Sequence, residues 1–176
     1  ADNSVTFRIF APDADKVTLS GGWMEGWGAS EALIKNDTGL WTLTVGPLEP
    51  EIYTYSFRID GITLMDPGNV RIIRDGARHS SMLFIPGEAS DLYQVQHVPH
   101  GTLSKVWYES PTLELTRRMY VYTPPGYESG SDHYPVFYLL HGGGGDEDAW
   151  STLGRACQIM DNLIAQKKAK PMIVVM

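Results

Sequence analysis

The sequence predicts two folds in series, an all-β sandwich over residues 1–87 and an α/β unit over residues 101–176. In the first part, apolar and polar side chains alternate in short runs between turn residues, which is typical of half-buried antiparallel strands. In the second part, residues 136–140 and 172–176 are wholly apolar, as in strands that are covered on both faces. Apolar residues between these two runs recur at helical spacing, which completes a strand–helix–strand unit.

Five alternating runs define the expected strands of the sandwich. They are residues 5–9, 17–19, 41–45, 53–59 and 82–85. Turn-forming pairs such as Asp60-Gly61 and Pro86-Gly87 separate or close them. Residues 88–100 are polar and lack periodicity, so we expect a linker there.

The second part begins with two expected strands, residues 102–107 and 117–123, which would form a hairpin. The run at 136–140 should then be a strand buried on both faces, followed by one helix over residues 151–168 with Ser151 as its N-cap. The crossover to the strand at 172–176 should be parallel and right-handed. In this chain alone, we expect the last strand to leave an unpaired apolar edge, which is an aggregation hazard.

A glycine stretch lies at the carboxyl end of the expected strand at 136–140. His141 comes first, residues 142–145 are all glycine, and residues 146–148 are acidic. Ligands of open α/β sheets bind at this end of the strands, and glycine lets the backbone approach a ligand closely. A phosphate loop is excluded because no Lys-Ser or Lys-Thr pair follows, and a dinucleotide fingerprint is excluded because residue 147 is Glu. A plain flexible loop remains the alternative.

Composition narrows the classes of partner. The chain carries 14 basic and 21 acidic residues, for a net charge of −7, without a basic block, so we expect no nucleic-acid partner. No apolar run approaches the length that spans a bilayer, so we expect no membrane association. The first residues, Ala1-Asp2-Asn3, fit a chain whose signal peptide has been removed, and predict a secreted or periplasmic protein. Cys157 is expected to be a small core residue.

Residues 1–87 resemble the isoamylase N-terminal module, also called family 48 of the carbohydrate-binding modules, an immunoglobulin-like sandwich. The resemblance lies in residues 5–12, 39–41, 53–61 and 66–67. Members that bind starch or glycogen use two aromatic platforms and a lysine. Trp23 or Trp27 stands where the first platform is expected, but Ile62 and Ser56 stand near the places of the second platform and the lysine. Trp23 and Trp27 are therefore candidate sugar-binding residues, with partly buried sandwich residues as the alternative.

Residues 101–176 resemble the esterase D-type α/β-hydrolases, with carbohydrate esterase family 1, the feruloyl and acetylxylan esterases, as the nearest branch. The matching segments are residues 120–127, 134–136, 139–142, 148–150, 161–163 and 171–175. The family's serine lies in a G-x-S-x-G elbow, which this chain lacks. The resemblance thus implies an α/β-hydrolase fold that is incomplete here, with Ser, Asp or Glu, and His all beyond Met176. It also implies that the remaining half of the hydrolase domain is a partner of this segment, which alone should be inactive.

The same resemblance implies roles for the glycine stretch. Gly143 is the expected donor of a backbone N–H to the oxyanion hole, with Gly142 beside it, while His141, Gly144 and Trp150 should shape the substrate site. Trp150 could instead anchor the loop to the core. The acidic residues after the glycines could bind a cation, but solvated carboxylates are the simpler expectation. Acyl transfer by a triad needs no cofactor or metal, and none is expected.

Three functions follow from the resemblances. The first is a feruloyl esterase that acts on acylated plant cell-wall polysaccharides or oligosaccharides, chiefly those derived from xylan. The second is a carbohydrate-binding module whose role is to tether a partner. The third is an esterase D-type hydrolase of another ester, such as a siderophore ester or a thioester.

Overall fold

The computed structural model describes residues 2–176, and the chain forms two compact units. The first unit extends to Ile73 and also includes His79–Asp91. The second unit consists of Arg74–Arg78 and Leu92–Met176. The five residues Arg74–Arg78 therefore come from the N-terminal part of the sequence but belong structurally to the second unit.

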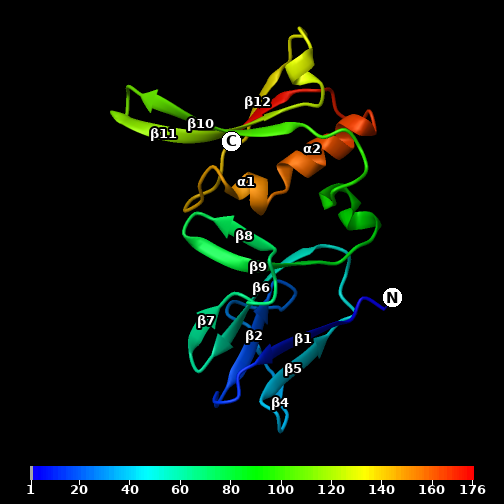
Figure 1. Ribbon diagram of the computed structural model, residues 1–176, viewed down its shortest axis with the longest axis vertical. Coiled ribbons are helices and arrows are strands. Elements are labelled where there is room, and N and C mark those ends of the chain that lie inside the picture. The colour runs from blue at the N-terminus through cyan, green and yellow to red at the C-terminus, as the bar shows by residue number, and fades with distance from the viewer. Residues whose placement is uncertain (1) are drawn as a thin grey trace. The chain divides into compact units, whose positions relative to one another are not determined.

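The first unit is an antiparallel β-sandwich (Figure 1). One sheet has the order β1-β5-β4, and the other has the order β3-β2-β6-β9-β8, with β7 paired to β6. The strands are β1 (Val5–Phe10), β2 (Val17–Gly21), β3 (Glu31–Ala32), β4 (Ile34–Lys35), β5 (Leu40–Val45), β6 (Ile52–Ile59), β7 (Ile62–Leu64), β8 (Ile72–Asp75) and β9 (Arg78–Phe84). The five predicted strands are confirmed as β1, β2, β5, β6 and β9, while the short strands β3, β4, β7 and β8 were not predicted.

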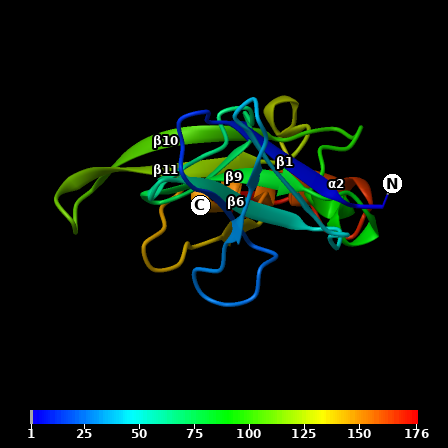
Figure 2. The same ribbon diagram turned by 90° about the horizontal axis from the view of Figure 1, so that it is seen from below.

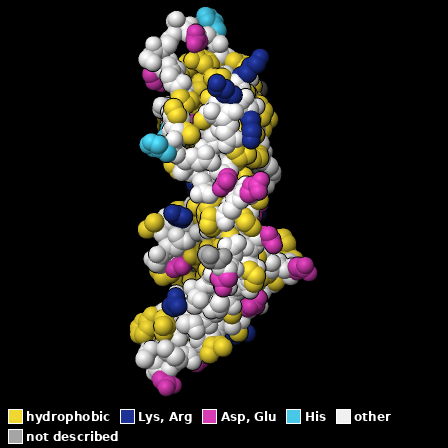
Figure 3. Space-filling view, turned by 90° about the vertical axis from the view of Figure 1, so that its right-hand side faces the viewer, with side chains coloured by type: hydrophobic (Ala, Val, Ile, Leu, Met, Phe, Trp, Pro, Cys, Tyr) yellow, Lys and Arg dark blue, Asp and Glu magenta, His cyan; other side chains and the backbone are white. Residues whose placement is uncertain are grey.

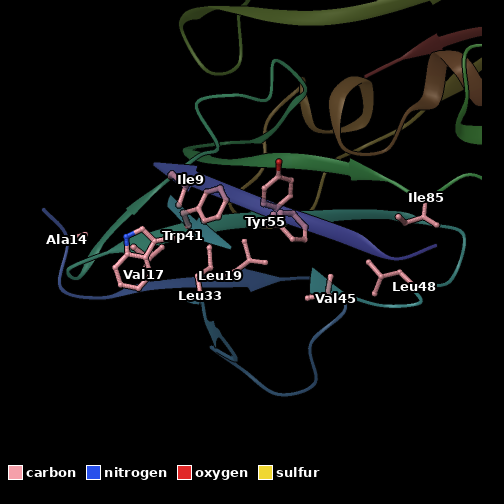
Figure 4. Packing of buried hydrophobic residues seen from close by; sticks show 12 residues of the cluster. Ile9, Ala14, Val17, Leu19, Leu33, Trp41, Val45, Leu48, Tyr55 and Ile85 are labelled. Atoms are coloured by element: carbon pink, nitrogen blue, oxygen red, sulfur yellow. The ribbon is translucent and has the colours of Figure 1, made fainter. Parts of the chain in front are cut away.

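Alternate side chains of the two sheets form the core of this unit. Figure 4 shows Ile9, Val17, Leu19, Trp41 and Tyr55 gathered between the strands that carry them. Other buried members of the cluster include Phe7, Leu33, Val45, Leu48, Phe57 and Ile85. Period-two alternation in the sequence thus corresponds to one buried face per strand.

The turn predicted at Asp60-Gly61 joins β6 to β7. Both residues have positive φ, 46° and 91°, as the two central residues of a type I′ hairpin turn require. The Asp60 carboxylate accepts hydrogen bonds from the backbone N–H groups of Asp15 and Lys16, at 3.1 and 2.8 Å. This side chain therefore ties the hairpin to the segment that precedes β2.

The second unit contains a mixed four-stranded sheet with the order β10-β11-β13-β12. Its strands are β10 (Thr102–Ser110), β11 (Leu115–Thr123), β12 (Val136–Tyr138) and β13 (Ile173–Val175). β10 and β11 form the predicted hairpin, which runs as a long ribbon in both views (Figure 1; Figure 2). β13 pairs antiparallel with β11 and parallel with β12, which confirms the parallel strand–helix–strand connection.

Two expectations about the strands of this unit are wrong. β12 is not buried on both faces, because Phe137 and Tyr138 are 47% and 68% exposed. The expected unpaired edge at residues 172–176 is also wrong, because β13 has a neighbour on each side. Among the described residues, the edge strands of this sheet are β10 and β12.

The single helix predicted over residues 151–168 is also wrong, because the structure has two helices, α1 (Ala149–Thr152) and α2 (Ala156–Ala165). A Cβ on Gly154 would lie 2.5 Å from the Trp150 ring, and Arg155 has a left-handed φ of 54°. The chain therefore turns between the helices, which a continuous helix cannot do. Asp148, not Ser151, occupies the N-cap position of α1.

α2 covers the sheet of the second unit and builds its core. Ala156 packs with Tyr120 and Tyr122 of β11 and with Val174 of β13, and Met160 and Cys157 lie against the same cluster. Burial raises the pKa of Cys157 to about 11, helped by the charge of the nearby Asp161. The expectation that Cys157 is a core residue agrees with this position.

Part of the predicted irregular linker is structured. A 3₁₀ helix, η1 (Glu88–Tyr93), starts after Gly87, and the Ser90 hydroxyl donates to the carbonyl of Ile85 at 2.8 Å. In the second unit, the Asn162 amide donates to the carbonyls of Leu92 and Gln94, at 3.0 and 2.9 Å. Hydrogen bonds from side chains to backbone carbonyls therefore hold this segment in place. A hydropathy pattern does not reveal such bonds.

On the face drawn in Figure 3, the charged side chains of the described residues are spread among apolar atoms rather than gathered in a basic patch, as the absence of a basic block in the sequence indicates. None of the helices in the described part of the chain has the length and hydropathy needed to span a bilayer.

The sandwich core generates a stability prediction. Phe57 is fully buried, whereas Phe10 on β1 is 66% exposed. We expect Phe57→Ala to lower the free energy of unfolding by about 3–5 kcal/mol, because it deletes a buried ring and leaves a cavity. Phe10→Ala serves as the matched control and should change it by less than about 0.5 kcal/mol. Denaturant unfolding of the sandwich measures both, and equal effects would contradict the assignment of this core.

Candidate active-site loop

The glycine stretch connects β12, the third strand of the second unit, to α1, its first helix. In α/β-hydrolases, the loop between the third strand and the first helix supplies one backbone N–H of the oxyanion hole. The glycines therefore follow a strand and precede a helix, as the sequence predicted, and their part in an oxyanion hole remains a prediction. We call residues 141–145 the glycine loop.

The backbone N–H groups of the glycine loop are available to a ligand. Within residues 2–176, those of Gly142, Gly143 and Gly144 donate to no protein acceptor. Gly145 N–H donates to the carbonyl of Gly142 at 3.1 Å, which closes a tight turn. A Cβ built on Gly143 would meet nothing within 4 Å, whereas Gly144 has a φ of +82° that favours glycine.

His141 is exposed and lies on the loop itself. Its Nδ1 is 2.8 Å from the carbonyl oxygen of Gly142, so the ring lies against the turn. This geometry suits the predicted role of His141 in shaping the loop, which remains a prediction.

The acidic residues after the loop are not simply solvated, which corrects that expectation. The guanidinium of Arg74 donates to Asp148 Oδ2 at 2.9 Å and also to Asp146 Oδ2. Arg118 of β11 donates to Glu147 Oε1. We call Asp146, Glu147 and Asp148 the acidic segment. Arginines thus hold all its carboxylates, and no group suited to a metal ion occurs among the described residues.

Electrostatics favour the charged forms of these partners. Burial opposes ionisation of Asp148, but hydrogen bonds from the Ser151 hydroxyl and from Arg74 outweigh it and lower its pKa. The pKa of Arg74 is raised, chiefly by its hydrogen bond to Asp148, and that of Arg118 by its hydrogen bond to Glu147. Arg118 also lies over the rings of Trp107 and Tyr120, at 5.5 and 5.4 Å.

Trp150 of α1 connects the loop to the core. Its indole N–H donates to the carbonyl of Leu140 at 2.9 Å, immediately before the loop. One side of the ring lines an apolar cavity of about 140 Å³, together with Phe137, Leu139 and Met160. These contacts fit the anchoring alternative directly and are also compatible with a pocket wall.

The two tryptophans predicted to bind sugar differ in their surroundings. Trp23 packs on the rings of Phe7 and Tyr53, with centroids 5.5 and 5.8 Å away, which fits the buried alternative. Trp27 is fully exposed and lines an open cavity of about 390 Å³ that Ser56 also lines. Ile62 is 72% exposed and does not line this cavity.

One polar cluster was missed from the sequence. Asp161 of α2 is 5% exposed, and its carboxylate accepts from the Tyr122 hydroxyl at 2.7 Å and from Gly101 N–H at 2.9 Å. His100 Nδ1 lies 2.9 Å from the same carboxylate. Burial and Asp161 together raise the pKa of Tyr122. An aspartate on the apolar face of a predicted helix was the available signal, because such a group needs buried partners.

The chain has a sandwich followed by a sheet, and a glycine loop with free N–H groups follows the third strand of that sheet. This is the layout of an accessory module joined to an α/β-hydrolase. Comparison with families agrees for each part. Residues 1–75 match carbohydrate-binding module 48 (isoamylase N-terminal domain), and residues 110–176 match the putative esterase family. The chain thus combines a family 48 carbohydrate-binding module with part of an esterase domain.

Comparison with individual proteins supports this assignment in sequence and in fold. The chain is 39% identical to the endo-1,4-β-xylanase/feruloyl esterase of Xylanibacter ruminicola, over 97% of this chain and 24% of that protein. The enterobactin esterase of Shigella flexneri superposes with a TM-score of 0.68 at 15% identity, over 98% of this chain and 50% of that one. The ferric enterobactin esterase of Salmonella typhimurium gives 0.66 at 14% identity, over 98% and 52%. At this identity the two structures show the fold, a sandwich followed by a hydrolase sheet, and they confirm the predicted fold class.

The ion pair between Asp148 and Arg74 predicts that the free energy of unfolding depends on pH. Its folded pKa lies below the ordinary value of 3.8. The pair therefore stabilises the fold fully above the unfolded pKa, and this contribution is lost as the pH falls through the folded pKa. The difference in free energy of unfolding between wild type and Asp148→Asn should be largest above about pH 5 and shrink below about pH 4.

Denaturant unfolding at a series of pH values measures this difference. Asp132→Asn, which changes an exposed loop residue, is the control and should leave the profile unchanged. A difference that grows on acidification would contradict the ion pair.

Proposed function

We propose that the chain is part of a serine carboxylic ester hydrolase that acts on acylated plant polysaccharides, with feruloyl esters of xylan as the substrate class. The observation that carries the proposal is the glycine loop between β12 and α1, with N–H groups that have no acceptor within residues 2–176. The 39% identity to a xylanase/feruloyl esterase supports the substrate class. The chain spans about a quarter of that protein, and the serine, acid and histidine of the triad are proposed to lie beyond Met176.

In this mechanism, the serine Oγ attacks the ester carbonyl carbon while its proton passes to the histidine. Negative charge develops on the carbonyl oxygen, where the N–H of Gly143 and that of the residue after the serine would donate. Collapse of this intermediate expels the sugar hydroxyl, which takes the proton from the histidine. Water then hydrolyses the acyl-serine by the same steps and releases ferulate.

The loop supports this role for a physical reason. Oxyanion donors act because they already point at the oxygen before charge develops, so no reorganisation is needed. Gly143 is exposed and its backbone N–H is free. The tight turn closed by Gly145 N–H and the carbonyl of Gly142 limits how the loop can rearrange.

The test uses the full-length enzyme with methyl ferulate and a feruloylated xylan oligosaccharide. We expect wild type to release ferulate. Gly143→Val keeps the backbone N–H but should lower kcat by altering the loop, by no more than the roughly 10²–10³-fold that is lost with one oxyanion donor. A side chain at Gly143 meets no neighbour within 4 Å, so the unfolding midpoint should stay near that of wild type. Near-normal turnover in the variant would remove Gly143 from the site, and a wild type without ester hydrolysis would refute the function.

A second candidate function, sugar binding by the module, is favoured by Trp27. Its fully exposed ring lines an open cavity with Ser56 and Thr54. Exposed aromatic rings beside polar groups suit stacking on a sugar face.

Isothermal titration with xylan and amylose fragments tests this function. Trp27→Ala should weaken binding by about tenfold, as expected when an aromatic anchor is removed. Phe10→Ala changes another exposed ring of the sandwich and should bind as wild type does. The absence of heat with either sugar would leave the module without a binding role.

A further inference from the structure

Arg74 makes a forked contact with the acidic segment. One guanidinium nitrogen donates to Asp148 at 2.9 Å and another to Asp146. The three side chains are only 17–29% exposed. Planar forked pairing of this kind fixes direction as well as distance, which a lysine cannot do.

The backbone of Arg74 is held as firmly as its side chain. The hydroxyl of Thr152 in α1 donates to the Arg74 carbonyl at 2.9 Å and accepts from the Arg74 N–H at 3.2 Å. Arg74 is therefore bound through its backbone to the last residue of α1 and through its side chain to the segment that precedes this helix. These contacts hold the guanidinium of Arg74 in one position and restrict the rotamers that its side chain can adopt.

The turn after Arg74 lies directly on the glycine loop. Gly76 has a φ of +61°, and a Cβ there would lie 2.1 Å from the carbonyl oxygen of Gly144. A Cβ on Gly145 would lie 2.6 Å from the Asp75 carboxylate. The close approach at Gly76 needs glycine, so there the two backbones meet without an intervening side chain, while the Asp75 side chain lies against Gly145.

The loop needs such support from outside. Glycines lose the most conformational freedom on ordering, and the N–H groups of Gly142, Gly143 and Gly144 make no bond within residues 2–176 that would restrain them. Trp150 fixes the start of the loop through the Leu140 carbonyl. The end of the loop is fixed where Asp146 and Asp148 follow it.

We propose that Arg74 is a positioning residue for the oxyanion hole, which holds the end of the glycine loop through Asp146 and Asp148 and so keeps the Gly143 N–H in its donating direction. This inference rests on the proposed function for its effect on catalysis, but its effect on the loop can be measured separately. Arg118, which holds only Glu147, is a second and lesser support.

The first measurement is amide hydrogen exchange in the full-length enzyme. Arg74→Ala should speed exchange of the Gly145 and Asp148 N–H groups, which donate to the Gly142 carbonyl and to Asp146 Oδ1, by tenfold or more, about 1.4 kcal/mol of lost protection. Arg117→Ala is the matched control, because Arg117 is exposed on β11 next to Arg118, and its exchange should match wild type. Unchanged exchange in Arg74→Ala would overturn the proposal, whatever the enzyme's activity.

The second measurement is ferulate ester turnover by the same variants. Arg74→Ala should lower kcat at least tenfold with less than a twofold change in KM, Arg74→Lys should recover part of the loss, and Arg117→Ala should behave as wild type. A normal kcat, or a rise in KM alone, would overturn the role in catalysis. If exchange is faster in Arg74→Ala but wild type hydrolyses no ester, the proposed function is refuted. The conclusion that Arg74 holds the end of the glycine loop would then still stand.

A third variant covers the case in which Arg74→Ala does not fold. The double change Asp146→Asn and Asp148→Asn keeps the shapes of both side chains but removes the charges that Arg74 binds. It should reproduce the faster exchange and the lower kcat. Wild-type behaviour in this variant would overturn the proposal.

Discussion

Two arginines pair with three consecutive carboxylates between the glycine loop and α1. Unpaired, Asp146, Glu147 and Asp148 would repel one another and any negative charge that develops nearby. Paired, they become a fixed support at one end of a loop whose glycines have almost no support of their own. The geometry of the candidate active site depends on this pairing, because the free N–H groups are useful only if they point in one direction.

The rest of the second unit provides the partners at the right places. β11 carries Arg118 on one part of the strand and Tyr120 and Tyr122 on the part covered by α2. Asp161 ties α2 to Tyr122 and to the chain that enters β10, so the helix and the hairpin cannot move independently. Two sets of polar contacts, the buried one at Asp161 and the partly exposed one at the acidic segment, therefore help to fix how the helices sit on the sheet.

The sequence predicted the regular features well, because one buried face per strand leaves a period of two in β1, β2, β5, β6 and β9. It also located the glycine loop, since an apolar run that ends in glycines marks the carboxyl end of a strand. It failed where the cause is a specific contact. An apolar run does not tell whether a neighbour covers it, so the exposure of β12 was missed, and the break at Gly154 depends on the Trp150 ring. The pairing of Arg74 with Asp146 spans 72 positions along the chain, and no local pattern encodes such a contact.

The close approach of Gly76 to Gly144 has a consequence for the modularity of the chain. Carbohydrate-binding modules are commonly regarded as exchangeable parts, yet here the segment Arg74–Arg78, from the module's end of the sequence, is built into the unit that carries the glycine loop. A replacement module would need a turn of the same length, with a glycine at its tip and an arginine two positions before it. Residues 74–78 should therefore stay with the second unit when the two parts of the chain are separated, because their contacts with the glycine loop and the acidic segment lie within that unit.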